Sequence, residues 1–119
     1  MVHLDSTRFG NIVIDGKKYR EDVFILGNGT IRDRKGMFPG FGSHEVDQKE
    51  VDELLKDNPD VLIIGKGQWG GGKLNPADKI VSSVRERGVE LIQLPTPKVI
   101  EKFNELTDKK VVALIHITC

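Results

Sequence analysis

The sequence predicts an α/β protein in which an antiparallel β-rich addition precedes an open sheet. In residues 1–45, short apolar runs alternate with turn dipeptides, whereas residues 46–119 alternate helical and strand patterns. The chain of 119 residues is shorter than one average domain. We therefore expect a single domain, 1–119, with a β-rich part (1–45) and an α/β part (46–119).

Two β-hairpins are predicted in the β-rich part. In each, two short runs flank a dipeptide, Asp15-Gly16 or Asn28-Gly29, that tolerates the positive φ of a tight turn. The predicted strands are Ile12–Ile14, Lys17–Tyr19, Val23–Leu26 and Thr30–Arg32.

A loop is predicted over Gly36–Gly42, because three glycines and a proline cannot sustain a ladder. Phe38 and Phe41 in this loop are candidate partner-binding residues, since aromatic side chains on a loop can form an interaction surface. The alternative is that both rings pack onto the sheet of their own chain.

The first long helix is predicted to begin after Asp47, an N-cap residue, with Glu50 at its third position. We expect the carboxylates of Glu50 and Glu53 to face water, as charged helix residues commonly do. The later elements follow in order: a strand at Val61–Ile64, a helix from Pro76 to Gly88, a strand at Leu91–Leu94, a helix from Thr96, and a strand at Val111–Ile117.

A glycine-rich segment follows the buried strand Val61–Ile64, and five of its residues 65–72 are glycine. Backbone N–H groups of such a loop can converge on an anion, and the carboxyl end of a parallel strand is a common ligand position. Alternatively, the segment is only a strand-to-helix connection. The candidate ligand-binding residues are Gly65, Gly67, Gln68, Trp69 and Lys73.

The same segment matches the first seven positions of a phosphate-binding loop, from Gly67 to Lys73. Leu74 stands where a magnesium-binding Ser or Thr is required, and the next helix is predicted to begin only at Pro76. These mismatches argue against nucleotide hydrolysis, and we predict no cofactor.

No catalytic residue and no metal site are predicted. His116 and Cys119 are close in sequence, but a structural zinc site needs four ligands in paired spacing. As a nucleophile and base they are also unconvincing, because the last residue of a chain is hard to hold rigidly. We expect His116 to point outward from its strand.

Composition restricts the partners. Lys and Arg number 18, as do Asp and Glu, so the zero net charge excludes a general nucleic-acid binder. No apolar run is long enough to span a membrane, and the single cysteine is typical of a reducing compartment, so we expect a cytoplasmic protein. Self-association as a homo-oligomer, through an exposed edge of the β-rich part, is a further hypothesis.

Several segments together resemble one known family. They are Val61–Gly67, Gly88–Glu90, Phe103–Leu106 and Ala113–Cys119. The resemblance is to the small single-domain family of the adipogenesis-associated domain protein and a mitochondrial complex I assembly factor, and it covers nearly the whole chain.

The resemblance implies a three-layer fold with a central mixed five-stranded sheet, flanking helices and a β-rich layer. It implies no catalytic residue. Relatives often carry tryptophans in the region matching Thr30–Arg34, where this chain has Ile31 and Asp33. We expect a non-enzymatic binding or assembly module with a protein partner. The alternative is a protein or enzyme that binds a small anionic ligand at Gly65–Lys73.

Overall fold

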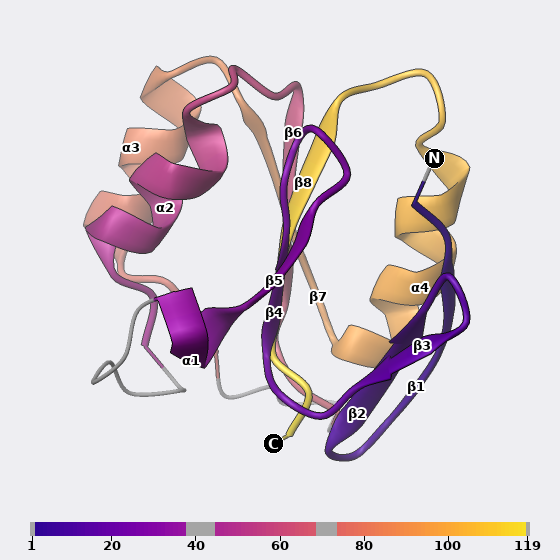
Figure 1. Ribbon diagram of the computed structural model, residues 1–119. Helices are drawn as coiled ribbons and strands as arrows, with labels where there is room; N and C mark the ends of the chain where they lie inside the picture. Colours follow the sequence, from indigo (N-terminus) through magenta and orange to yellow (C-terminus); the bar gives the residue numbers. More distant parts are fainter. Residues whose placement is uncertain (1, 38–44, 69–73, 119) are drawn as a thin grey trace.

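A mixed five-stranded sheet forms the centre of the computed structural model, which describes residues 2–37, 45–68 and 74–118 (Figure 1). Its strands are β4 (Val23–Ile25), β5 (Ile31–Asp33), β6 (Val61–Gly65), β7 (Glu90–Leu94) and β8 (Val111–Ile115). Their order in the sheet is β5-β4-β8-β6-β7.

The strand directions bring four strand ends together at one end of this sheet. β6 is parallel to both β7 and β8, and β4 is antiparallel to β8. Because Val23 pairs with Ile115, the residue before β4 lies beside the residue after β8. The carboxyl ends of β6, β7 and β8 and the amino end of β4 therefore meet.

A smaller antiparallel sheet has the order β1-β2-β3, with β1 (Leu4–Arg8), β2 (Asn11–Ile14) and β3 (Lys17–Tyr19). Its β2–β3 turn has positive φ at Asp15 (49°) and Gly16 (80°), as the dipeptide predicts. β1 is missing from the sequence-based prediction because only Leu4 is buried and the strand shows no apolar alternation.

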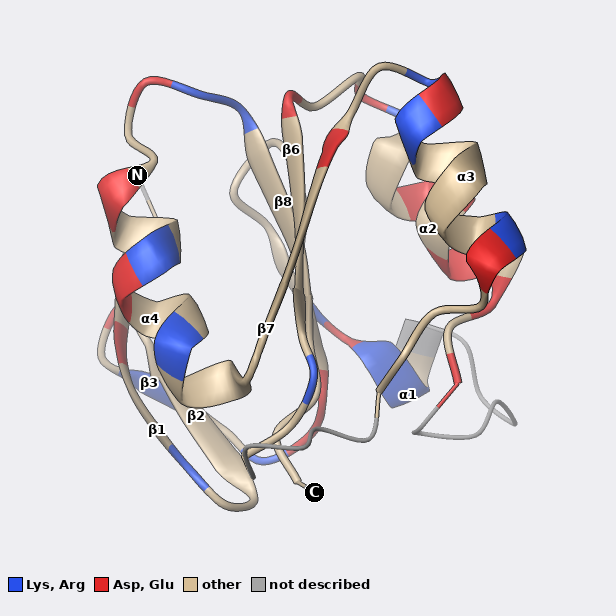
Figure 2. Cartoon of the chain, turned by 180° about the vertical axis from the view of Figure 1, so that it is seen from behind, with Lys and Arg blue, Asp and Glu red and all other residues tan. Residues whose placement is uncertain are grey.

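The helices divide between the two faces of the large sheet. They are α1 (Arg34–Met37), α2 (Gln48–Leu55), α3 (Asp78–Glu86) and α4 (Thr96–Glu105). α2 and α3 cover one face, whereas α4 and the smaller sheet cover the other (Figures 1 and 2). Two apolar clusters fill the spaces between these three layers. The predicted three-layer α/β fold is confirmed.

Some predicted boundaries need correction. The capping box of α2 is present, with Asp47 and Glu50 exchanging hydrogen bonds as expected. α3, in contrast, begins at Asp78, two residues after the predicted Pro76, with Ala77 as its N-cap. β8 ends at Ile115 rather than Ile117, because the Ile117 N–H donates to a side chain instead of continuing the ladder. Phe38 and Phe41 lie outside the described residues.

Candidate functional site

The buried polar residues of the described chain gather at the end of the large sheet where these four strand ends meet. Arg34, Glu50, Thr96 and His116 are buried, and Asp22 beside them is 12% exposed. We call these five residues the strand-end network. They come from five different elements or element ends, so the network exists only in the folded chain.

Arg34 is the central cation of the network. Its Nε and Nη2 donate to the two carboxylate oxygens of Glu50 at 2.5 and 3.0 Å, a bidentate geometry. Its Nη1 donates to Asp22 Oδ2 at 3.1 Å, and its Nη2 also donates to the Glu45 carbonyl. The guanidinium thus joins the β4 end, α1 and the first turn of α2.

Asp22 connects Arg34 to the end of β8. Its Oδ2 accepts from His116 Nδ1 at 2.8 Å, and its Oδ1 accepts from the Ile117 N–H at 3.0 Å. Burial acts to raise the pKa of Asp22. The hydrogen bond and charge of His116, the Ile117 N–H and the charge of Arg34 outweigh burial and hold this pKa below its ordinary value. Asp22 is therefore a carboxylate at neutral pH.

The same balance operates at Arg34. Burial alone would lower its pKa, but the hydrogen bonds and charges of Glu50 and Asp22 together raise it. The expectation that Glu50 faces water is wrong, since this side chain is fully buried. Glu50 Oε1 accepts a hydrogen bond from Arg34 Nη2. It also caps α2 by accepting from the Asp47 N–H at 3.0 Å.

Thr96, at the start of α4, joins β6 to β8. Its Oγ1 donates to the His116 carbonyl at 2.6 Å and accepts from the Gly67 N–H at 3.0 Å. A Cβ on Gly65 would lie 3.0 Å from that Oγ1 and 3.2 Å from Ile115 Cγ2, so a side chain there would require these neighbours to shift by a few tenths of an ångström. Gly65 therefore serves close packing.

The described part of the glycine-rich segment uses its amides internally. The N–H groups of Lys66, Gly67 and Gln68 donate to Leu94 O, Thr96 Oγ1 and Thr118 O, respectively. The Gln68 side chain donates to Thr7 Oγ1 at 2.9 Å. The structure thus brings the predicted residues Gly65, Gly67 and Gln68 against the network. Their amide and side-chain donors serve the fold there. Trp69 and Lys73 lie outside the described residues, and an anion site at those two positions remains a prediction.

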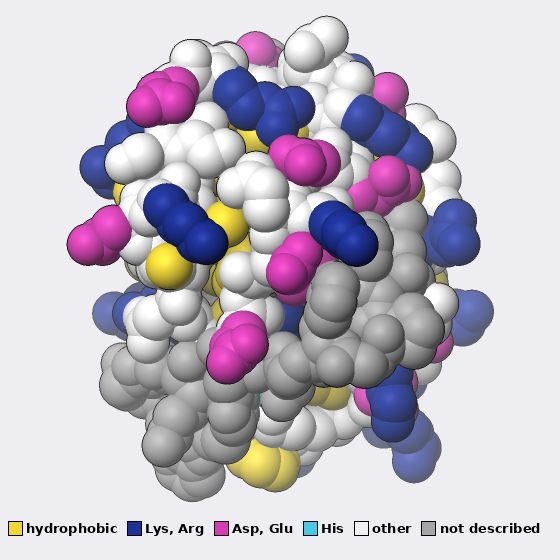
Figure 3. Space-filling model, turned by 90° about the vertical axis from the view of Figure 1, so that its left-hand side faces the viewer, with side chains coloured by type: hydrophobic (Ala, Val, Ile, Leu, Met, Phe, Trp, Pro, Cys, Tyr) yellow, Lys and Arg dark blue, Asp and Glu magenta, His cyan; other side chains and the backbone are white. Residues whose placement is uncertain are grey.

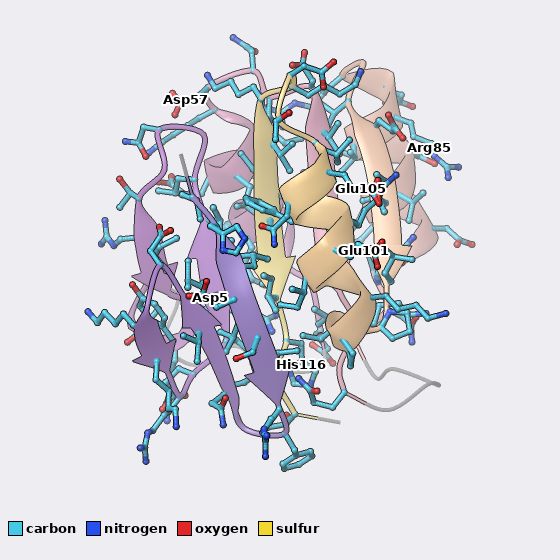
Figure 4. All side chains as sticks on the ribbon, turned by 90° about the vertical axis from the view of Figure 1, so that its right-hand side faces the viewer. Asp5, Asp57, Arg85, Glu101, Glu105 and His116 are labelled. Atoms are coloured by element: carbon cyan, nitrogen blue, oxygen red, sulfur yellow. The ribbon has the colours of Figure 1, made fainter. Side chains whose placement is uncertain are left out.

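His116 is completely buried, which overturns the expectation that it points outward from its strand. Figure 4 labels it at the end of β8. Asp22 accepts from Nδ1, so Nδ1 carries the proton; Nε2 lies 3.2 Å from Thr118 Oγ1.

The carboxylate, imidazole and hydroxyl of Asp22, His116 and Thr118 follow the order of a hydrolase triad. Two features separate them from one. Arg34 already neutralises the carboxylate that would stabilise an imidazolium. An oxyanion also needs free donors, whereas the neighbouring Gln68 N–H is bonded to Thr118 O. Every buried side-chain nitrogen and oxygen of the described residues has a hydrogen-bond partner, so the network is saturated.

A separate depression of about 670 Å³ lies at the opposite end of the sheet. Phe103, Ile25 and Val111 contribute to its lining, with Lys109 and Lys110 among the polar residues. The Lys110 ammonium donates to the Asp57 carbonyl at 2.5 Å, so this group already has an acceptor within the protein. None of the predicted site residues that the structure describes lines the depression.

The remaining surface gives few indications of chemistry. Across residues 2–37, 45–68 and 74–118, no three His, Cys, Asp or Glu side chains are grouped to hold a metal ion. No helix in these ranges has the length and apolar composition to cross a membrane. On the face that carries α2 and α3, basic and acidic side chains are interspersed (Figure 3).

A family model described as "Protein of unknown function (DUF498/DUF598)" matches residues 4–116. The chain therefore belongs to this family. No curated protein matches the chain.

Experimental structures share the fold. The conserved hypothetical protein PH1505 from Pyrococcus horikoshii is 31% identical over 98% of both chains, with a TM-score of 0.82. A structure described as MT938 is 27% identical over the full length of both chains, with a TM-score of 0.77. A Bordetella pertussis protein described as a Mth938-like domain is 13% identical over 97% of this chain and 85% of its own, with a TM-score of 0.66.

The expected resemblance is thus confirmed in part, because the chain belongs to a family of unknown function and has the Mth938-like fold. The names given above do not mention adipogenesis, so that part of the resemblance remains an expectation. The strand-end network was not predicted as a unit from the sequence. Glu50 was recognised only as a cap, and nothing local links Asp22, Arg34 and His116, which are distant in the chain.

Replacing Gly65 tests its packing role. Gly65→Ala should lower the free energy of unfolding by about 1–3 kcal/mol, because the new methyl group overpacks the Thr96 and Ile115 contact. Gly36→Ala is the matched control, since among the described residues a Cβ there meets Asp33 Cβ alone, at an ordinary 3.6 Å. Urea unfolding measures both. Equal stabilities for the two variants would contradict the assignment.

Acid titration tests Asp22. Its folded pKa lies below its unfolded pKa, so its contribution is complete above about pH 4 and is lost as pH falls through the folded pKa. Asp22→Asn should cost about 1.5–3 kcal/mol at pH 7, and this difference should shrink below pH 4. Urea unfolding at several pH values measures it, with the exposed Asp108→Asn as control. A difference independent of pH would contradict the account.

Proposed function

We propose that this protein is a non-enzymatic binding or assembly module that accepts an extended strand of a protein partner along the open edge of β7. The observation that carries the proposal is the outward-facing backbone of β7. Such strand addition is a recurring mode of peptide recognition, in which main-chain hydrogen bonds supply affinity.

The two sheets have four edge strands, and three of them carry features that discourage pairing. β1 has an irregular register between Leu4 and Ser6. The side chain of Asn104 also occupies both the N–H and the C=O of Leu4, at 2.9 and 2.8 Å. β3 and β5 have three residues each, including Lys17 and Lys18 in the former and Arg32 and Asp33 in the latter.

β7 differs from these edges. It has five residues, Glu90–Leu94, with no lysine, arginine or proline and with its one charge at its first position. Seen from behind, β7 crosses in front of the other strands of the sheet, with α3 and α4 to either side (Figure 2). No other described strand pairs with its outer side.

The hydrogen-bond pattern shows which groups of β7 face outward. The Glu90 N–H donates to Asp60 O, and Leu94 O accepts from the Lys66 N–H, so both residues face β6. Alternate residues of a parallel strand bond to opposite sides. The N–H and C=O groups of Leu91 and Gln93 therefore point away from the sheet.

Apolar side chains accompany this edge. Leu91 is half-buried against the cluster on the α2/α3 face, and Ile92 and Leu94 are half-buried against the cluster on the α4 face. A partner strand with apolar residues on both of its faces would extend both clusters. The saturated strand-end network further supports binding over catalysis, because it leaves no buried polar side chain of the described chain uncommitted.

Amide hydrogen exchange tests this proposal. In dilute isolated protein, the amides of Leu91 and Gln93 should exchange faster than that of Ile92, which faces β6. In an extract of the source cells, a bound strand should slow exchange at Leu91 and Gln93 of isotope-labelled protein by about tenfold or more. Unchanged rates at both amides would contradict the proposal.

Two variants at one position provide the control. Gln93→Pro removes an outward N–H without breaking a bond to β6, so it should abolish the protection of Leu91 in the extract. Gln93→Thr retains the N–H and should retain the protection.

A further inference from the structure

We infer that the strand accepted by β7 is β7 of a second copy of this chain, paired antiparallel about a two-fold axis at Ile92. The inference rests on the proposed function and specifies its partner. The result would be a continuous ten-stranded sheet across two copies, with an isologous interface.

The register follows from the outward groups. With the axis at Ile92, Leu91 lies opposite Gln93 of the second copy, and Gln93 lies opposite Leu91. Opposed residues whose backbone groups face each other exchange two hydrogen bonds in an antiparallel pair. All eight outward N–H and C=O groups of the two strands are then satisfied by four hydrogen bonds. The edge is thus complementary to itself.

Neighbouring registers satisfy fewer groups. An axis at Leu91 places Gln93 opposite Val89, whose N–H already donates to Val84 O at 3.4 Å. An axis at Gln93 places Leu91 opposite Pro95, which has no N–H. An axis midway between two residues places each outward-facing residue opposite a residue whose backbone groups face β6, so no hydrogen bonds form between them. Only the axis at Ile92 uses every outward group.

The side chains fit the same register. Ile92 lies opposite Ile92 of the second copy in a non-hydrogen-bonded pair, where side chains approach most closely. Both are half-buried on the α4 face, so the pair would join the two apolar clusters there. Glu90, the one charge of β7, lies opposite Leu94 and away from its own symmetry copy, which avoids a repulsive pair.

Disulfide trapping tests the register. In a Cys119→Ser background, Ile92→Cys should form a cross-linked dimer under mild oxidation, because its Cα atoms would be about 4.5 Å apart. Glu90→Cys is the matched control on the same strand face. Its two copies would be about 14 Å apart, so it should not cross-link. Cross-linking of both variants, or of neither, would contradict the inference.

Solution mass provides a second measurement that does not depend on a cysteine. With rising concentration, light scattering should show the mass increasing from 13.3 kDa toward twice that value. Gln93→Pro should remain at the mass of one chain with an unchanged circular dichroism spectrum, whereas Gln93→Thr should still double. A wild-type mass that stays at one chain would overturn the inference.

The two proposals fail differently. If the mass stays at one chain but Leu91 and Gln93 become protected in the extract, the strand comes from another protein and only the second-copy inference is wrong. If neither amide is protected under any condition, both are wrong.

Discussion

The fold depends on a buried ion pair between Arg34 and Glu50, two residues that lie 16 positions apart in the chain. Burying a charge is costly unless it is paired and hydrogen-bonded, and here each partner meets the other in a bidentate contact. Asp22 extends the pair to the end of β8 through His116. These contacts fix how α1 and α2 lie against the ends of β4 and β8. They therefore determine the geometry of this end of the sheet.

In this arrangement, side chains of the kinds that active sites use are hydrogen-bonded to one another. Acid, base and cation are all present, but each polar group is satisfied by another part of the fold. Reactivity requires groups that are free to change partners, as an oxyanion hole or a general base must. The outward peptide groups of β7 are the contrasting case, because a second strand would satisfy them.

Local residue patterns predicted much of the fold. The Asp15-Gly16 turn, the capping box at Asp47 and the apolar run of β6 each depend on a few consecutive residues. The site could not be predicted in this way. The helical pattern predicts a solvated Glu50 unless the position of Arg34 is known. His116 can be buried because Asp22, which is 94 residues away in the chain, accepts a hydrogen bond from it. Likewise, β7 is an edge strand of the described sheet because of the strand order, which periodicity does not encode.

A double-mutant cycle between Arg34 and Glu50 tests the central claim most directly, namely that the strand-end network serves the stability of the fold. Arg34→Met and Glu50→Leu should each lower the free energy of unfolding by about 3–5 kcal/mol, because each leaves the other charge buried and unpaired. The double variant should be destabilised by less than the sum, which reveals strong coupling. Single variants that each cost under about 1 kcal/mol and add without coupling would contradict the claim.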